Sequence, residues 1–199
     1  PENMKELIAD KDYIRLDIFL SEKLNITRSK VQKLLSLGCI RGKSPTLKSS
    51  MKVSEGDIFY AELPPSDNLE ALQGEDVDFD VVYEDEHLIV VNKPAGVVVH
   101  PAPGNWHGTL IQGLVLRYPE MKEMTAFMRP GIVSRLDQGT SGLMVVARNE
   151  DTSRLLSEMF ASRQVDKYYL ALVHGCPPKP EGLLSGPIDA DPNDPLKRV

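Results

Sequence analysis

The sequence predicts an α+β protein with a small α+β module ahead of a larger domain, whose mixed, mainly antiparallel sheet is flanked by helices. Three observations predict this class. Apolar residues recur at helical spacing near residues 15–35. β-Branched runs at 81–83 and 88–92 are typical of strands. A proline-containing, acid-rich stretch at 62–78 separates the two parts and is expected to be an acidic linker.

The composition favours a globular protein without a membrane segment. The chain has 199 residues, of which 41% are hydrophobic, and this length suits a small module followed by a medium-sized domain. No apolar run reaches the roughly 18 residues that a membrane helix needs. The first residues contain no apolar signal core, so a cytoplasmic location is expected. Cys39 and Cys176 are far apart and lack zinc-site spacing, so no metal site is expected.

The net charge of −6 hides a strong asymmetry along the chain. Residues 13–60 hold nine Lys or Arg and four Asp or Glu, a balance of +5. Residues 61–87 hold ten acidic residues and no Lys or Arg, a balance of −10. Because polyanion binding depends on the local patch rather than on the total, the basic leading module remains a candidate for RNA binding.

The leading module, residues 13–61, is expected to begin with two helices. The first helix is predicted over 15–24, and the second opens at Thr27, which is a good N-cap. Gly38 fits the position just beyond the second helix. A turn at 42–43 then leads into short strands that end at 58–60.

Several short motifs in this module are similar to those of the S-four RNA-binding domain, named after the fourth small-subunit ribosomal protein. They are Arg15-Leu16-Asp17, Thr27-Arg28-Ser29, Gly38, Gly42-Lys43 and Val53-x-x-Gly56-Asp57. The resemblance implies that the second helix and the following hairpin contact folded RNA. The candidate RNA-binding residues are Arg28, Lys30, Lys33, Arg41 and Lys43. The alternative interpretation is a small basic domain whose charged face is merely solvated.

The larger domain is expected over residues 79–199. Its strands are β-branched and mostly apolar on both sides, which predicts a sheet covered on both faces. The first helix of this domain is predicted over 109–116, and a second helix is predicted to be capped by Asp151 or Thr152. The predicted strands are 81–83, 88–92, a resumption at 97–100, 142–148 and 168–173.

One loop of this domain places an acid between an arginine and two glycines, just before an apolar strand. It contains Arg135, Asp137 and Gly142 within the run Arg135-Leu136-Asp137-Gln138-Gly139-Thr140-Ser141-Gly142. A carboxylate can attack a glycosidic carbon or an electron-poor uracil ring. The alternative is that Asp137 ties a turn through backbone N–H groups, which is a common role for aspartate.

This loop resembles the catalytic motif R-L-D-x-x-T-S-G of the RluA/RluC/RluD-type pseudouridine synthases. Two further segments resemble that family in the same order, 93–101 followed by 108–110, and Lys167-x-Tyr169-x-Ala171-x-Val173-x-Gly175. The resemblance implies a pseudouridine synthase fold, an isomerase activity on uridine in RNA, and no metal or organic cofactor.

The resemblance also implies a role for each of three residues. Asp137 attacks the target nucleotide, and Arg135 fills the gap that the extruded base leaves, which suits a planar cation. Tyr169 stacks on the uracil near the proton that leaves carbon five. Composition alone favours the other interpretation of Tyr169, a half-buried strand tyrosine of the core.

Two departures from the family pattern stand out. Ser134 occupies the position where the family usually has histidine. A later arginine-containing motif, whose side chain pairs with the catalytic aspartate in the family, has no counterpart before Val199. The C-terminal part of the fold is therefore expected to be absent from this sequence.

The leading hypothesis is an RNA pseudouridine synthase acting on structured RNA, with 23S-type ribosomal RNA of the large subunit as the expected partner. The alternatives are a synthase acting on transfer RNA and a non-catalytic RNA-binding protein. A glycoside hydrolase would need a second carboxylate at about 5–10 Å. The next acids, Glu150 and Asp151, lie about 17 Å away along a strand, which excludes that idea. The oligomeric state is not readable from the sequence.

Overall fold

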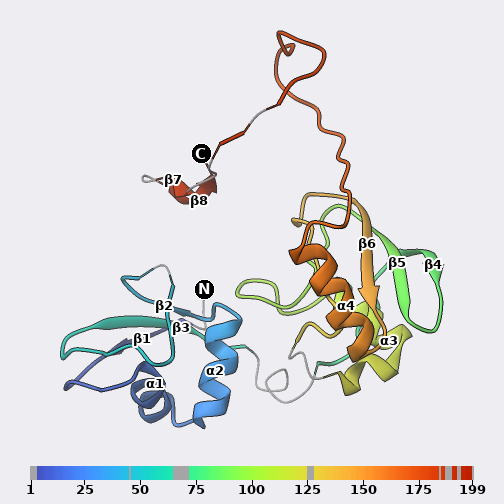
Figure 1. Cartoon of the computed structure of the whole chain (residues 1–199). Coiled ribbons are helices and arrows are strands. Elements are labelled where there is room, and N and C mark those ends of the chain that lie inside the picture. The colour runs from blue at the N-terminus through green and yellow to red at the C-terminus, as the bar shows by residue number, and fades with distance from the viewer. Residues whose placement is uncertain are drawn as a thin grey trace. The chain divides into compact units, whose positions relative to one another are not determined.

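The computed structural model contains two compact units, residues 1–165 and 166–199 (Figure 1). The first unit holds two modules, each with its own sheet and its own hydrophobic core. Within the described parts of the chain, no helix is both long enough and apolar enough to cross a membrane. The structure describes residues 4–44, 46–64, 72–124, 128–183, 185–186, 190–191 and 194–198.

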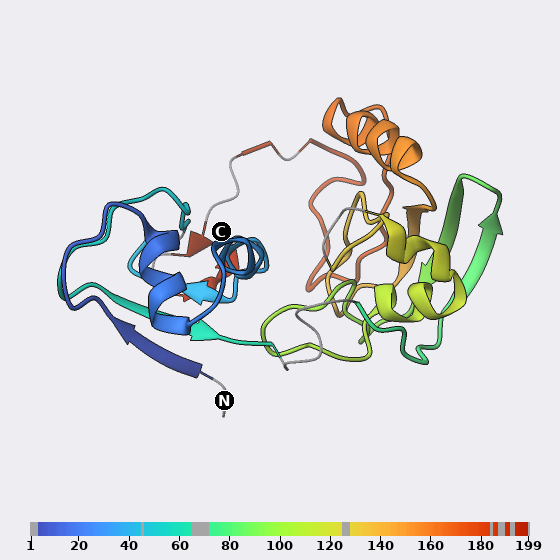
Figure 2. The ribbon, with the colours of Figure 1, turned by 90° about the horizontal axis from the view of Figure 1, so that it is seen from below.

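The first module is a three-stranded antiparallel sheet packed against two helices (Figures 1 and 2). The strand order is β1-β3-β2, with Leu7 opposite Phe59 and Ile40 opposite Ala61. The elements in chain order are β1 (Met4–Ile8), α1 (Leu16–Leu24), α2 (Arg28–Ser36), β2 (Ile40–Arg41) and β3 (Ile58–Glu62).

Both predicted helices of this module are confirmed, because apolar spacing and end signals agree. Leu16, Phe19 and Leu20 of α1 are fully buried, and Phe19 lies 5.5 Å from Phe59 between ring centroids. The Thr27 hydroxyl accepts the Lys30 backbone N–H at 3.3 Å and caps α2. Gly38 has φ +71°, the left-handed conformation that ends a helix at little cost for glycine.

Strand β1 is an addition that the sequence pattern did not predict. Its burial pattern leaves only Leu7 buried, so the strand carries little apolar periodicity. It forms because its backbone pairs with the full length of β3. β2 pairs with the opposite edge of β3. In the long connection between β2 and β3, Val53 bridges back to Tyr13.

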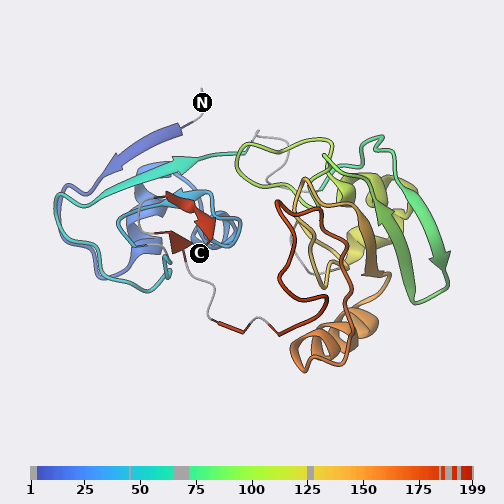
Figure 3. The same ribbon diagram turned by 90° about the horizontal axis from the view of Figure 1, so that it is seen from above.

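The second module is built on an antiparallel sheet of order β4-β5-β6 (Figures 1 and 3). In the central pairing, Ile89 faces Val146 and Val91 faces Met144. Both α+β content and antiparallel pairing agree with the prediction. The elements are β4 (Asp80–Glu84), β5 (Leu88–Lys93), α3 (Leu110–Arg117), the 3-10 helix η2 (Pro119–Glu123), β6 (Gly142–Ala147) and α4 (Glu150–Ala161).

Only one face of this sheet is covered by a packed core. Ile89, Val91, Met144 and Val146 are buried in one cluster together with the apolar side of α3. On the other face Leu143 is 66% exposed, and α4 contributes no buried residue. On this second face Ala147 is nevertheless buried and Val90 and Val145 are half-buried, so among the described residues the expectation of a sheet covered on both faces holds only in part.

The predicted strand at 97–100 is also wrong, and its hydrogen bonds explain why. The Val98 and Val99 carbonyls accept the backbone N–H groups of Leu110 and Ile111 at 2.8 and 3.0 Å. The Val97 carbonyl accepts the Lys93 ammonium at 2.8 Å. These carbonyls are thus used by the first turn of α3 and by a lysine, not by a neighbouring strand.

Two further differences concern α4 and the chain beyond it. α4 is capped by Asn149, whose side chain accepts the Thr152 N–H at 2.9 Å, and not by Asp151 or Thr152. The predicted strand 168–173 is wrong: no described residue pairs with it, and Leu170 is fully exposed. The second unit contains β7 (Ala190–Asp191) and β8 (Asp194–Arg198), which pair with each other.

The predicted acidic linker 62–78 lies partly outside the described residues. Residues 72–78 carry contacts that the expectation of a solvated tether did not include. Leu72 packs against the second core, and the Glu75 N–H donates to the Gln112 carbonyl at 3.1 Å. The proposed domain boundaries stay a prediction.

Candidate active site

The loop that carries Asp137 lies at the start of β6. Ile132 bridges to Val146 on one side of this loop, and Gly142 opens β6 on the other. The Asp137 carbonyl accepts the Thr140 N–H at 3.0 Å, which closes a tight turn. Asp137 itself is exposed, and its carboxylate accepts no hydrogen bond from any residue that the structure describes. The turn is therefore held by backbone atoms, and the carboxylate is left available.

A fully buried lysine holds this loop through hydrogen bonds to its backbone. Lys93 ends β5, and its ammonium donates to the carbonyls of Pro94 and Val97 at 2.8 Å and of Gln138 at 3.3 Å. Its side chain is 0% exposed. Burial lowers the pKa of the Lys93 ammonium, while the negative charge of Asp137 raises it. A positive charge is thus held close to the candidate nucleophile.

Backbone pairing adds a second link between the same two loops. The Gly96 N–H donates to the Gln138 carbonyl at 2.7 Å, and the Gln138 side-chain amide donates back to the Gly96 carbonyl at 3.1 Å. Gly96 has φ +91°, which an L side chain rarely adopts. Residues 94–97 are therefore held in a fixed conformation next to the loop that carries Asp137.

His100 lies close to two arginines, Arg135 and Arg129. Burial, with the nearby guanidinium groups of Arg135 and Arg129, lowers the pKa of His100 to about 4. Nδ1 of His100 is buried and has no partner among the described residues. Arg135 is exposed, whereas Ser134 is half-buried. The two guanidinium groups near His100 and the Lys93 ammonium near Asp137 make this part of the molecule positively charged, which suits an anionic ligand.

The three residues predicted to carry the chemistry are not all in one unit. Arg135 and Asp137 share one loop of the first unit, both exposed. Tyr169 belongs to the second unit and is 64% exposed. The role assigned to Tyr169 stays a prediction.

The basic candidates of the first module come from α2 and from the chain around β2. Arg28 is held by Asp17, whose carboxylate is fully buried and also accepts two hydrogen bonds from Arg15. The Arg15 guanidinium lowers the pKa of Asp17 well below its usual range against the effect of burial, and Arg28 adds to this. Lys43 is largely exposed and lies 3.7 Å from Asp57. Lys30 and Lys33 are half-buried on α2, and Arg41 is exposed at the end of β2.

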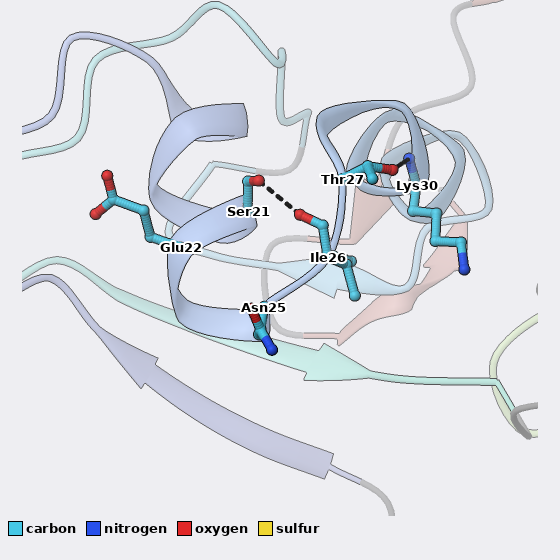
Figure 4. A pocket seen from close by; sticks show the side chains of 6 residues that line it. All are labelled: Ser21, Glu22, Asn25, Ile26, Thr27 and Lys30. Carbon is cyan, nitrogen blue, oxygen red and sulfur yellow. Dashed lines mark hydrogen bonds between the residues drawn. The ribbon is translucent and has the colours of Figure 1, made fainter.

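A shallow hollow of about 490 Å³ lies where α1 ends and α2 begins (Figure 4). Its hydroxyl groups are already engaged, because Ser21 donates to the Ile26 carbonyl at 2.6 Å and Thr27 caps α2. Lys30 is among its lining residues, and Asp137 is not. No group of three potential metal ligands occurs among the residues that the structure describes.

Sequence reasoning missed three residues of this arrangement. Lys93 was part of a motif, but its three carbonyl acceptors could not be read from spacing. His100 lies in the motif segment 93–101, but only folding brings it near Arg129. Asp17 was noted as part of a motif without its role of organising two arginines.

A comparison with known protein families identifies the family of this chain. The family model described as RNA pseudouridylate synthase matches residues 87–198, more than half of the chain and including the Asp137 loop. The chain therefore belongs to the RNA pseudouridylate synthase family.

Its relatives carry related names. "Uncharacterized RNA pseudouridine synthase YlyB" of Bacillus subtilis is 37% identical over 90% of this chain and 59% of its own length. An "Uncharacterized RNA pseudouridine synthase" of Chloroflexus aurantiacus is 42% identical over 92% and 57%. "Ribosomal large subunit pseudouridine synthase D" of Nitrosomonas europaea is 36% identical over 96% and 55%. The chain thus spans about half the length of the curated relatives it matches.

Among solved structures, "Human RNA Pseudouridylate Synthase Domain Containing 4" is 30% identical over 42% of this chain and 30% of its own chain, with a TM-score of 0.32. Family membership rests on the sequence matches.

Proposed function

We propose that this protein is an RNA pseudouridine synthase, an isomerase that converts uridine to pseudouridine in structured RNA. The observation that carries the proposal is the exposed Asp137 carboxylate on a loop anchored by Lys93, inside the region that matches the family. The reaction detaches uracil from the sugar and rejoins it through carbon. It needs no net oxidation or reduction, so no cofactor is part of the proposal.

The roles proposed for the three residues come from the resemblance to the family, and for Asp137 and Arg135 they are supported by exposed positions on one loop. Asp137 acts as the nucleophile, towards either the sugar carbon or the uracil ring. Arg135, two residues away and exposed, enters the gap left by the flipped base. Tyr169 stacks on the uracil in this scheme.

The first module is proposed to bind RNA as an S-four-like domain. Support comes from its two-helix and sheet architecture and from its basic residues on α2 and around β2. Contacts with phosphates release counterions, so affinity for RNA falls steeply with added salt. Arg41→Ala removes one exposed cation, and the slope of log affinity against log salt is expected to fall by about 1 if it contacts phosphate.

Large-subunit ribosomal RNA is the proposed substrate, because two of the relatives are named "Ribosomal large subunit pseudouridine synthase D". The cytoplasm is the proposed location. The test incubates the full-length gene product with 23S-type ribosomal RNA and with transfer RNA, followed by chemical detection of pseudouridine. Product in the ribosomal transcript supports the proposal. Product only in transfer RNA would mean that transfer RNA, and not ribosomal RNA, is the substrate. RNA binding without product in either RNA would mean that the protein binds RNA without modifying it.

A further inference from the structure

A loop of the second module reaches the first module and contacts it at two points. Trp106 packs against the hydrophobic core of the first module. The Gly104 N–H donates to Oε1 of Glu62 at 2.8 Å, and Glu62 is the last residue of β3. Figures 2 and 3 both show this loop, in light green, next to the end of β3. The two modules are thus joined by a contact besides the chain that links them.

The loop has its own fixed shape before it meets the first module. Ala102 and Asn105 exchange backbone hydrogen bonds of 3.1 and 2.8 Å, which closes a tight turn. Gly104 sits in that turn with φ +82°, a conformation that favours glycine. Because the turn is held by its own backbone, the Gly104 N–H is presented outwards for Glu62.

The other end of the loop is anchored to α3. Glu75 accepts the Gly108 N–H at 2.7 Å and lies 2.7 Å from Nδ1 of His107. The Gln112 side-chain amide donates to Glu75 at 2.6 Å and to the Trp106 carbonyl at 3.2 Å. Trp106 is therefore attached to the second module through its backbone and to the first module through its ring.

We propose that residues 101–108 form a docking loop that fixes the first module against the second, with Trp106 as its positioning residue. The docking itself does not depend on the proposed activity. Its consequence does rest on the proposed function: a docked basic module holds RNA at a set distance from Asp137, and so selects which uridine reaches that loop. His100 directly precedes the docking loop, so the loop begins at the candidate site.

The first test measures whether the two modules tumble together. Backbone ¹⁵N relaxation is recorded on the whole chain and on Trp106→Ala, with Trp106→Phe as a matched control that keeps an aromatic ring. Docking predicts one rotational correlation time for both modules in the wild type and in Trp106→Phe. It predicts two different times in Trp106→Ala, with each module still folded. Two times in the wild type, or one shared time in Trp106→Ala, overturns the proposal.

The second test uses Trp106 as the reporter, since it is the only tryptophan of the chain. Glu62→Ala removes the acceptor of the Gly104 N–H, whereas Glu62→Gln keeps a carbonyl oxygen that can accept it. Losing one hydrogen bond of ordinary strength lowers the ratio of docked to undocked molecules by about fivefold. Trp106 emission is expected to shift to the red and acrylamide quenching to rise in Glu62→Ala but not in Glu62→Gln. Equal emission and quenching in all three proteins contradicts docking through Glu62.

Neither test contains RNA or measures product. A negative result therefore removes the docking loop and leaves the proposed isomerase activity untouched, and a failure of the activity assay leaves the docking result standing.

Discussion

Replacing Lys93 by methionine is the most informative perturbation of the candidate site. Methionine has nearly the same length but carries neither the charge nor the donors. The substitution removes the hydrogen bonds to the carbonyls of Pro94, Val97 and Gln138. It therefore separates the anchoring of the Asp137 loop from simple filling of space.

The size of the effect follows from the acceptors that lose their partner. The Gln138 carbonyl keeps the Gly96 N–H at 2.7 Å, whereas those of Pro94 and Val97 lose the ammonium. A buried unsatisfied carbonyl costs about 1–3 kcal/mol, and relief from burying a charge offsets part of the total. We expect Lys93→Met to lower the free energy of unfolding by about 2–3 kcal/mol.

Chemical denaturation followed by circular dichroism measures this loss, with Lys122→Met as a control because Lys122 is exposed. The control is expected to stay within about 0.5 kcal/mol of the wild type. Pseudouridine formation by folded Lys93→Met is expected to fall, because the Asp137 loop loses an anchor. Unchanged stability and unchanged product in Lys93→Met would refute the anchoring role.

Three further outcomes are expected. Asp17→Asn lowers the free energy of unfolding of the first module by about 2–3 kcal/mol, because the half-exposed guanidinium groups of Arg15 and Arg28 lose a fully buried carboxylate as partner. Urea titration measures this loss, and an unchanged midpoint would show that the ion pairs of Asp17 do not stabilise the module. Gly131→Ala lowers the free energy of unfolding by about 3 kcal/mol or more, since φ of Gly131 is +71° and a Cβ would meet the Ala147 carbonyl oxygen at 2.1 Å. Gly139→Ala has open space around its Cβ and leaves the free energy of unfolding nearly unchanged. Equal urea midpoints for the two variants would contradict this expectation. His100 has a folded pKa of about 4 against 6.5 unfolded, so its contribution is complete above pH 6.5 and is lost as the pH falls towards 4. Wild type is expected to lose roughly 2–3 kcal/mol more than His100→Gln across that range, and parallel pH curves would exclude the assignment.

The sequence predicted those elements whose local signals agree with their packing. Thr27 and Gly38 mark both ends of α2, and buried residues at helical spacing fill α1. α3 begins after Thr109, where a capping box forms with Gln112. In α2 and α3 the caps and the buried residues indicate the same boundaries, whereas in α1 the buried residues alone indicate the helix.

The errors occur where tertiary contacts decide. Residues 97–100 look like a strand, but their carbonyls are taken by α3 and Lys93. Residues 168–173 have the composition of a strand, but no described residue pairs with them in a sheet. β1 has weak periodicity and exists because β3 offers an edge. Hydrogen-bond partners far away in the chain cannot be read from a local pattern.

The candidate site was predictable as a motif and not as an arrangement. Asp137 and Arg135 follow from the run of residues around them. The buried ammonium of Lys93 and the His100 imidazole beside two arginines depend on segments about 30–45 residues apart in sequence, which only the fold brings together. Exposure of the Asp137 carboxylate likewise emerges only from the structure.

The nucleophilic role of Asp137 is tested directly by measuring pseudouridine formation by Asp137→Asn in the full-length gene product. Asparagine keeps the shape of the side chain and removes the nucleophilic carboxylate. If Asp137 is the nucleophile, product disappears in Asp137→Asn while RNA affinity is retained. Asp151→Asn, at an exposed position on α4, makes product at the wild-type rate. A wild-type product yield from Asp137→Asn would show that the Asp137 carboxylate is not the nucleophile.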